Sequence, residues 1–380
     1  MSVWSELVGQ EPVVATLREA AADGGRGGGM THAWLFTGPP GSGRSNAARA
    51  FAAALQCERG GCGECQSCRT SLAGSHPDVT LLRTDGLSIG TDLARDHVRK
   101  AALHPAVGRW QVIIVEDADR LTDQAANALL KSVEEPSPQT VWMLCAPAVE
   151  DVLVTIRSRC RPVLLRTPPT DAIARLLVER DGVEPALAGA VAAAAQGHIG
   201  RARGLARDEE ARGRRRDILA IPSRLRGIGD ALAAAQRIHD EAQQRAAATA
   251  DAADVRELDD LKASWGVEDR GRRPGGYAGA LSSLEKDQKR RRTRLARDAM
   301  DGVLLDLLSL CRDVAATQLA PGAPLVNADV ADEVARLAGL WGPESTMRRI
   351  AAIVETREAL TANAAPLLAL ERMMLEFLDR

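Results

Sequence analysis

Four cysteines lie close together in the first third of the chain: Cys57, Cys62, Cys65 and Cys68. They follow the spacing C-x4-C-x2-C-x2-C, among glycine, glutamate and serine residues that favour a loop. Four thiolates at this spacing suit the tetrahedral coordination of Zn²⁺. Protein side chains would fill all four positions and leave none for a water molecule, so the site would be structural rather than catalytic. Disulfides or free thiols are the alternative interpretation.

A glycine-rich segment, "GPPGSGRS", almost spells the phosphate-binding P-loop G-x-x-x-x-G-K-[ST]. Gly38, Gly41 and Gly43 would let backbone N–H groups converge on phosphate oxygens, and the helix that follows would add the positive end of its dipole. Ser45 would hold Mg²⁺, but Arg44 stands where lysine belongs. A guanidinium is bulkier than an ammonium group and cannot act as a point charge under the loop. The sequence therefore allows weak binding of ATP or ADP, and the alternative is a glycine turn with no ligand.

The run "VIIVEDAD" ends an apolar strand on Glu116 and Asp117. A working ATPase of this type has the order Asp-Glu, in which the aspartate supports Mg²⁺ and the glutamate polarises the attacking water. The reversed order makes one side chain a methylene too long and the other too short. An error of about 1 Å can lower a rate roughly 10²-fold. With Arg44, this is a second departure in the same machinery, so we predict a degraded nucleotide site rather than two solvated acids.

The segment "TIRSRCRP" (155–162) places Arg159 between Ser158 and Cys160 in a short loop between two expected strands. An arginine in such a loop can extend out of its subunit as a finger that reaches a neighbour's γ-phosphate. The tripeptide alone is a weak signal, and an ion pair on the surface is the alternative interpretation.

Alternating strands and helices must position these residues. Apolar runs predict strands, and those that are apolar on both faces suit a parallel sheet covered by helices. The expected strands are 33–37, 78–83, 110–117, 140–146 and 161–166. Helices are expected between them, at 44–55, 91–103 and 121–136. The alternation predicts an α/β domain with a parallel sheet over residues 1 to about 167, carrying the cysteine loop 57–68.

The segment "TPPTD" (167–171) marks the end of that domain, and the rest of the chain is expected to be helical. We predict a small helical lid over 168–208 and an all-α domain over 209–380. Within the latter, a charged stretch poor in aromatic residues, 243–297, is broken by "GRRPGGYAG" and predicts a partly exposed or disordered insertion. The last helices are expected at 299–320, 328–340 and 344–379.

Composition narrows the classes of protein. A chain of 380 residues suggests two or three domains, and its net charge of -2 means that any contact with nucleic acid must come from a local patch or from partners. No run of 18 apolar residues predicts a membrane span. The start, "MSVWSELVGQEP", has neither the basic nor the apolar region of a secretory signal. We therefore expect a reducing, cytoplasmic compartment with thiols that are free or metal-bound.

In their order along the chain, several segments resemble bacterial clamp-loader subunits of DNA polymerase III, members of the AAA+ superfamily. These are "LVGQEPVV" (7–14), "GPPGSGRS", the four-cysteine loop, "NALLKSVEEP" (127–136) and "RSRC" (157–160). The resemblance covers residues 1 to about 207 through motifs and the remainder through architecture. It implies a AAA+ P-loop domain, a helical lid and a helical collar that joins subunits.

Two kinds of subunit in that family compete as models. The ATP-hydrolysing motor, tau/gamma, has the lysine P-loop, the Asp-Glu pair and an arginine in its lid, whereas this chain has Gly200 in "QGHIGRARGLA" where that arginine would fall. The chain is more similar to the subunit that keeps the fold and the S-R-C arginine but has lost its ATPase. That resemblance implies no hydrolysis by the chain alone, and an Arg159 that acts in trans on an adjacent motor.

The family also implies partners. Five subunits, with tau/gamma and delta among them, would form an open ring held by their collars. ATP bound by the motors would let the ring open the sliding clamp and place it on primer–template DNA. No membrane takes part.

Two other functions stay open. The first is an active ATPase, either a motor clamp loader or a helicase-type enzyme, which Ser45 and the glycine loop favour and which Arg44, Glu116 and Gly200 oppose. The second is a zinc-binding adaptor for nucleic acid, suggested by the run 286–297 with its seven lysine or arginine residues and one aspartate. Such runs are more often a solvated helix face, and no aromatic residues are interleaved to stack on bases.

Overall fold

The computed structural model describes residues 2–23, 29–84, 86–267 and 274–378. The chain divides into two compact units, residues 1–206 and 207–380. The first contains the sheet, and the second is built from helices among its described residues.

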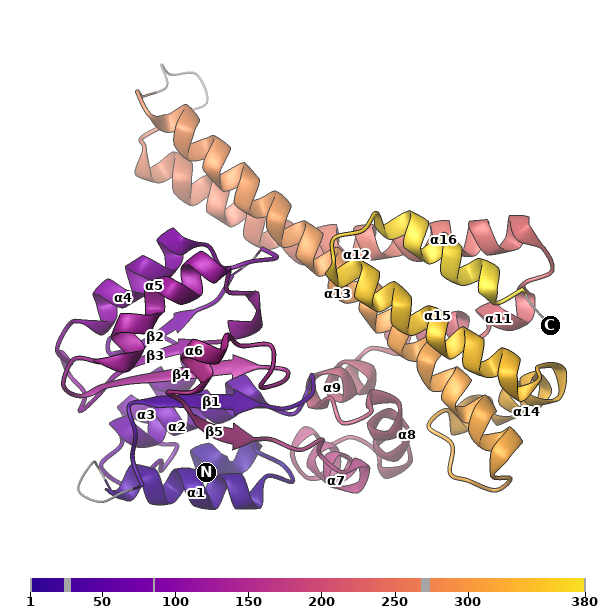
Figure 1. Ribbon diagram of the computed structural model, residues 1–380, viewed down its shortest axis with the longest axis horizontal. Coiled ribbons are helices and arrows are strands. Elements are labelled where there is room, and N and C mark those ends of the chain that lie inside the picture. The colour runs from indigo at the N-terminus through magenta and orange to yellow at the C-terminus, as the bar shows by residue number, and fades with distance from the viewer. Residues whose placement is uncertain (1, 24–28, 85, 268–273, 379–380) are drawn as a thin grey trace. The chain divides into compact units, whose positions relative to one another are not determined.

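The first unit is organised around a five-stranded sheet with the order β2-β3-β4-β1-β5 (Figure 1). The strands are β1 (Ala33–Thr37), β2 (Val79–Leu82), β3 (Gln111–Val115), β4 (Thr140–Ala146) and β5 (Arg161–Leu164). All four pairings are parallel. Every residue of β1, β3 and β4 is buried, as expected for parallel strands that are covered on both faces. The predicted parallel α/β architecture is confirmed.

Helices cover both faces of this sheet (Figure 1). One layer packs on Trp34 and Phe36 of β1, and the other packs on Leu35 of the same strand, because successive side chains of a strand point to opposite faces. The first layer contains η1 (Val3–Glu6), α1 (Glu11–Asp23), α2 (Arg44–Gln56) and α3 (Gln66–Ala73). The second contains α4 (Thr91–Ala101), η2 (Ala118–Arg120), α5 (Asp123–Glu134) and α6 (Val154–Arg157).

Three short helices follow β5 and form a small bundle: α7 (Thr170–Asp181), α8 (Pro185–Ala195) and α9 (Ile199–Arg207). Glu6 of the N-terminal η1 ties this bundle to the sheet domain. Its carboxylate lies 2.6 Å from Nη1 of Arg180 and 3.2 Å from Nη1 of Arg203. The start of the chain thus forms ion pairs with two of the three bundle helices.

The second unit contains two long helices and several shorter ones. The long pair, α12 (Ile228–Ser264) and α13 (Tyr277–Leu319), packs side by side, and its far ends extend beyond the helices that pack on it (Figure 1). The others are α10 (Glu209–Leu219), α11 (Ile221–Arg224), η3 (Ala328–Val330), α14 (Ala331–Leu340), α15 (Pro343–Thr361) and α16 (Pro366–Glu376). The expected single helix 344–379 is wrong: Asn363 has a φ of 65°, and Pro366 starts a new helix.

The expected insertion 243–297 is an integral part of these two helices. Residues 243–264 continue α12 and residues 277–297 begin α13, while 268–273 lie outside the described residues. Small side chains make close packing possible. A seam of alanines at intervals of four residues, Ala242, Ala246 and Ala250, is buried along α12. Within the described residues the stretch is helical and many of its side chains are exposed, which agrees with the expected partial exposure and not with disorder.

The alanine seam of α12 ends in a buried carboxylate. Asp254 is 6% exposed and forms ion pairs with Arg291 and Arg292 of α13, at 2.7 Å for Nε of Arg292. Glu257, one turn further, pairs with Arg291 at 2.5 Å. Burial opposes the ionisation of Asp254, but hydrogen bonds from both guanidinium groups outweigh it and hold the pKa of Asp254 below its usual value.

Replacing Asp254 with alanine should destabilise the α12–α13 pair by about 3 kcal/mol, because Arg291 and Arg292 lose a buried partner. Hydrogen exchange of amides in 243–264 measures this local opening. Since the pKa is depressed in the folded chain, the contribution is present above the unfolded value of about 3.9 and is lost as pH falls below it. The gap between wild type and variant should therefore shrink from pH 7 toward about pH 3.

The control for this change is Asp259→Ala on the same helix. Asp259 is 66% exposed and lies 3.8 Å from Lys262, so its loss should alter stability by no more than about 0.5 kcal/mol. Equal effects of the two replacements would show that the burial of Asp254 does not increase its contribution to stability.

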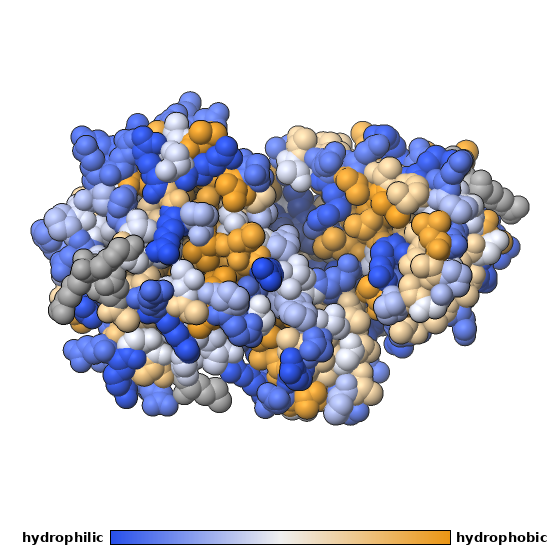
Figure 2. All heavy atoms as spheres, turned by 60° about the horizontal axis from the view of Figure 1, so that its bottom comes forward, coloured by the Kyte–Doolittle hydropathy of each residue, from blue (hydrophilic) through white to orange (hydrophobic). Residues whose placement is uncertain are grey.

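Charged and apolar residues are interspersed on the surface. The face drawn in Figure 2 carries hydrophilic side chains with several apolar groups between them. Large apolar residues with high exposure, such as Val107 at 76% and Leu164 at 66%, belong to different segments. Of the helices within the described ranges, none combines the length and the apolar character that a membrane crossing requires.

Candidate functional site

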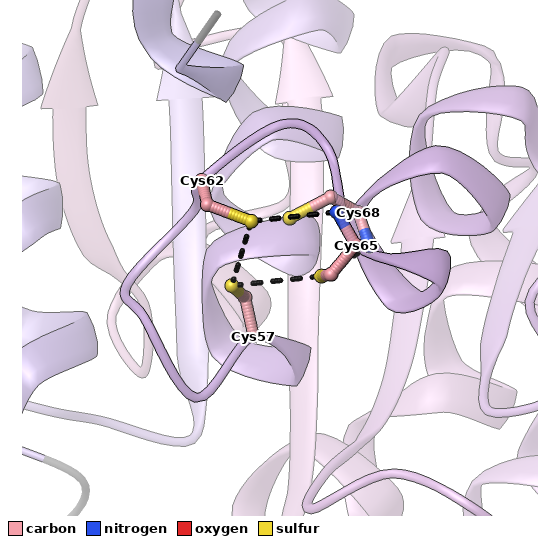
Figure 3. A group of neighbouring side chains, drawn as sticks. All are labelled: Cys57, Cys62, Cys65 and Cys68. Atoms are coloured by element: carbon pink, nitrogen blue, oxygen red, sulfur yellow. Dashed lines mark hydrogen bonds between the residues drawn. The ribbon is translucent and has the colours of Figure 1, made fainter.

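The four cysteines of the predicted metal site meet at one point (Figure 3). Their Sγ atoms all lie within 4.8 Å of one another, and Sγ of Cys57 is 3.7 Å from those of Cys62 and Cys65. All seven cysteines are free thiols, so the disulfide alternative is not supported. A tetrahedron of thiolates about 2.3 Å from a zinc ion has edges of about 3.8 Å. The spacing therefore fits a four-thiolate metal site.

Two helix ends hold the cysteines in place. Cys57 follows the last residue of α2, and Cys65 caps the N-terminus of α3 by accepting the N–H of Cys68 on its sulfur. The expected loop 57–68 is therefore too long, because Cys68 lies in the first turn of α3. Backbone geometry explains the shift: a sulfur acceptor at the N-cap satisfies one of the free N–H groups with which a helix begins.

Hydrogen-bond donors surround the sulfur of Cys62. The N–H of Cys65 donates to it at 3.4 Å and Nη2 of Arg59 donates at 3.2 Å. Backbone N–H groups of Glu64 and Cys65 lower the pKa of Cys62 to about 6, whereas burial raises the pKa of Cys68. A cation at the centre would favour the thiolate form of all four side chains. Because the protein would supply every ligand, such a centre would organise the loop but offer no open position for chemistry.

The cysteine loop also fixes the start of the chain. The N–H of Val3 donates to the carbonyl of Gly61 at 3.1 Å, and Nε1 of Trp4 donates to the carbonyl of Gly60 at 3.4 Å. Gly61 has a φ of +98°, and a Cβ there would lie 2.6 Å from Cγ2 of Val3. Glycine is needed at this contact. Since Glu6 in turn holds the α7–α9 bundle, the cysteine loop supports more than its own fold.

The P-loop has the backbone form of a phosphate cradle. Gly38, Gly41 and Gly43 all have positive φ, at +152°, +85° and +91°, which side chains with a Cβ rarely adopt. The helix α2 begins directly after Gly43, so its free N–H groups face the loop. The hydroxyls of Thr37 and Ser42 are buried there, and neither has a hydrogen-bond partner among the described residues. The segment has kept the shape of an anion site.

Side chains of the same chain occupy this cradle. Nη1 of Arg44 donates a hydrogen bond to the carbonyl of Gly38, so the guanidinium bends back over its own loop. From the bundle, His198 lies directly on Gly41, where an added Cβ would be 2.5 Å from the Cα of His198. Desolvation lowers the pKa of His198, and the nearby cations Arg201 and Arg44 lower it further. An uncharged imidazole is therefore expected at neutral pH.

The acidic half of the site forms an ion pair with an arginine side chain. Glu116, the first residue after β3, accepts hydrogen bonds from Nη2 and Nε of Arg49 at 2.7 and 3.0 Å. The two side chains are 14% and 26% exposed. Asp117 follows and precedes the short helix η2. Both bonds fall on Oε1, and the guanidinium offsets the negative charge with which Glu116 would bind a cation or activate a water molecule, so the arrangement disfavours hydrolysis.

The structure brings the sequence-predicted nucleotide residues together at the carboxyl ends of β1 and β3, and Ser45 lies in the first turn of α2. Sequence reasoning missed Arg49 and His198. Arg49 lies 67 positions from Glu116, and no local pattern links them. The only sequence signal for His198 was its place in the segment "QGHIGRARGLA", which was noted above for Gly200.

Arg159 stands apart from this group. It follows α6, and its Nη1 donates to the carbonyl of Thr155 at 2.7 Å and to Oγ of Ser158 at 3.1 Å. Its Nη2 forms an ion pair with Glu134, the last residue of α5. Arg159 and its three partners, Thr155, Ser158 and Glu134, all lie outside the P-loop. With 38% of its side chain exposed, Arg159 is accessible from solvent.

Residues 9–169 match the model of a protein family described as "DNA polymerase III, delta subunit". Among curated proteins, the chain is 38% identical over 189 residues to the DNA polymerase III subunit gamma/tau of Mycobacterium tuberculosis, covering 47% of this chain and 32% of that protein. It is 41% identical over 135 residues to subunit delta' of Pseudomonas aeruginosa, covering 34% and 41%. With delta' of Bacillus subtilis the identity is 34% over 191 residues, covering 49% and 56%.

These matches cover only part of each curated relative. They span from about a third to just over half of the length of the curated relatives. Among solved structures, a gamma subunit-related protein of Thermotoga maritima aligns with 97% of this chain at 14% identity, with a TM-score of 0.45. That score is below the level at which a likeness identifies a fold.

Proposed function

We propose that this chain serves as the delta′-type subunit of a bacterial clamp loader, because residues 9–169 match a family model described as "DNA polymerase III, delta subunit" and parts of the chain are similar to delta' subunits. In this role it hydrolyses no ATP. It acts as a fixed member of the complex and donates Arg159 to the ATP site of a neighbouring motor subunit.

The observation that carries this choice is the state of the nucleotide-type site. The glycine cradle is intact, but Arg44 bonds to the carbonyl of Gly38 and Arg49 neutralises Glu116. A motor needs a cation that reaches the β and γ phosphates and a carboxylate that is free to act on water. Here both groups are engaged within the chain. This favours the non-hydrolysing subunit over a motor or helicase-type ATPase.

The remaining assignments extend the same proposal. The Cys57, Cys62, Cys65 and Cys68 cluster holds a structural Zn²⁺, and ADP or ATP binds weakly if at all. Partners are the tau/gamma and delta subunits in a ring of five, the sliding clamp, and primer–template DNA reached through the complex. The collar is the second unit, and the compartment is the cytoplasm.

The nucleic-acid adaptor finds less support. Its basis was the basic run 286–297, but Arg291 and Arg292 of that run are paired with Asp254, Glu257 and Asp251 of α12. Cations used to hold two helices together are less available for phosphates. The charge of the run is thus explained in part by the packing of the helix pair.

Assembly tests the proposed function. Co-expressed with the tau/gamma and delta subunits of the same organism, the chain should elute with them as one complex in size-exclusion chromatography. Because both halves of its own site are engaged, the purified chain alone should hydrolyse ATP at background level, and Arg44→Lys should not restore activity.

Two results would count against the proposal. One is a failure to associate with either subunit at micromolar concentrations. The other is turnover of ATP by the isolated chain near about 1 s⁻¹, which is within the range of ordinary enzymes and would favour the motor.

A further inference from the structure

Glu134 forms an ion pair with the guanidinium group of Arg159, which the proposed function requires. The terminal nitrogens of an arginine are the donors with which it clamps a phosphate in a bidentate manner. In this chain Nη2 of Arg159 is paired with Glu134, and Nη1 is bonded to Thr155 and Ser158. Both nitrogens are therefore engaged within the subunit. These contacts use three of the five guanidinium N–H groups, so a clamp on a neighbour's phosphate through both terminal nitrogens must displace or share at least one of them.

The dipole of α5 does not favour a carboxylate at the position of Glu134. It is the last residue of α5, where the negative end of the helix dipole disfavours a carboxylate. The cation of Arg159 compensates for this. Since α5 packs against α6, the backbones that carry the two side chains are held near each other. Glu135, the next residue, is also exposed, and within the described ranges no ion pair is recorded for it.

We propose, on the basis of the proposed function, that Glu134 is a positioning residue that acts as a latch on Arg159. It holds the guanidinium on its own subunit and competes with the γ-phosphate of the neighbour's nucleotide. The two side chains are 38% and 40% exposed, and ion pairs with such exposure are weak. A triphosphate carries more negative charge than one carboxylate, so the latch gives way when the neighbour's nucleotide approaches.

A first experiment uses the isolated chain and needs no partner. Phenylglyoxal modifies accessible guanidinium groups, and mass spectrometry can follow its rate at Arg159 with Arg157 as an internal reference. Glu134→Gln keeps the shape of the side chain and removes its charge, so it should raise the rate at Arg159 two- to five-fold. The matched control Glu135→Gln should leave the rate unchanged. An unchanged rate in Glu134→Gln overturns the latch.

A second experiment uses the complex assembled with the tau/gamma and delta subunits. Glu134→Gln should raise kcat for clamp-stimulated ATP hydrolysis two- to five-fold, about 0.4–1 kcal/mol at 1.36 kcal/mol per tenfold, with the KM for ATP unchanged. In an Arg159→Ala background the same replacement should have no effect, because the latch acts only through that arginine. Glu135→Gln should match wild type.

The outcomes distinguish the latch role of Glu134 from the finger role of Arg159. If Arg159→Ala lowers the rate but Glu134→Gln leaves it unchanged, the latch is wrong and the finger stands. If Glu134→Gln still raises the rate without Arg159, Glu134 acts elsewhere and the latch is again wrong. If Arg159→Ala itself leaves the rate unchanged, the finger is wrong, and the latch has no role in hydrolysis.

Discussion

Replacing Arg159 with alanine should abolish most ATP hydrolysis at the one motor site that borders this subunit. An arginine that stabilises the charge of the transferring γ-phosphate contributes about 10³–10⁵ in rate at its site. The loss measured for the whole complex should be smaller, because the other sites keep their own arginines. Clamp-stimulated ATPase and clamp loading on primed DNA, measured in the reconstituted complex, test this expectation.

The fold and the assembly should survive this change. Arg159 is partly exposed, and removing an exposed ion pair costs at most about 1 kcal/mol. Arg157→Ala, two residues earlier at the end of α6, is the matched control and should leave ATPase and loading within about two-fold of wild type. If the Arg159→Ala complex loads clamps at the wild-type rate with normal hydrolysis, the arginine is only one half of a surface ion pair.

The sheet could be read from the sequence because its strands are short, apolar and buried on both faces. "AWLFT" and "TVWMLCA" were predicted with the bounds that the structure has, at 33–37 and 140–146. The cysteine cluster was also predictable, since its four ligands are local and their spacing limits their geometry. In both cases the relevant physics lies within a few residues of chain.

The helix pair α12–α13 was not predictable by the same reasoning. Charge composition over 243–297 indicated exposure or disorder, but the acids lie mainly on one helix and the bases on the other, where they pair across the interface. Asp254 and Arg291 are 37 positions apart. Their pairing depends on an antiparallel register that a hydrophobic pattern along one helix does not specify.

The same limit applies to the candidate site. The sequence identified Arg44 and Glu116 as departures from a working ATPase but gave no sign that Arg49 pairs with Glu116. It also identified Arg159 without its partner Glu134. These pairs link residues on different elements, and only the packing of α2 and α5 on the sheet brings them together.

Removing the metal should have the largest effect on stability. The purified chain should contain about one zinc ion, measured by elemental analysis, because a four-thiolate site binds one ion. Structural zinc supplies an apparent 10–16 kcal/mol to small peptides that lack another core. Here the loop borders a packed α/β domain, so we expect the domain to stay folded while the loop opens.

The opening should spread along the contacts that the loop makes. Cys62→Ser or a chelator should raise hydrogen exchange in 57–68 and also in 2–7 by at least about 100-fold, or about 2.7 kcal/mol, because Val3 and Trp4 bond to Gly61 and Gly60. Ser67→Ala, which lies between two of the ligands and keeps all four thiols, is the control and should retain both the metal and the protection.

Two results would contradict this account of the cysteine cluster. A folded sample never exposed to chelator that contains no metal would show that the thiols serve only as packing. Full protection of 2–7 in the Cys62→Ser variant would show that the N-terminal segment is held by its apolar contacts alone. In the second case, the ion pairs of Glu6 with Arg180 and Arg203 would form independently of the cysteine loop.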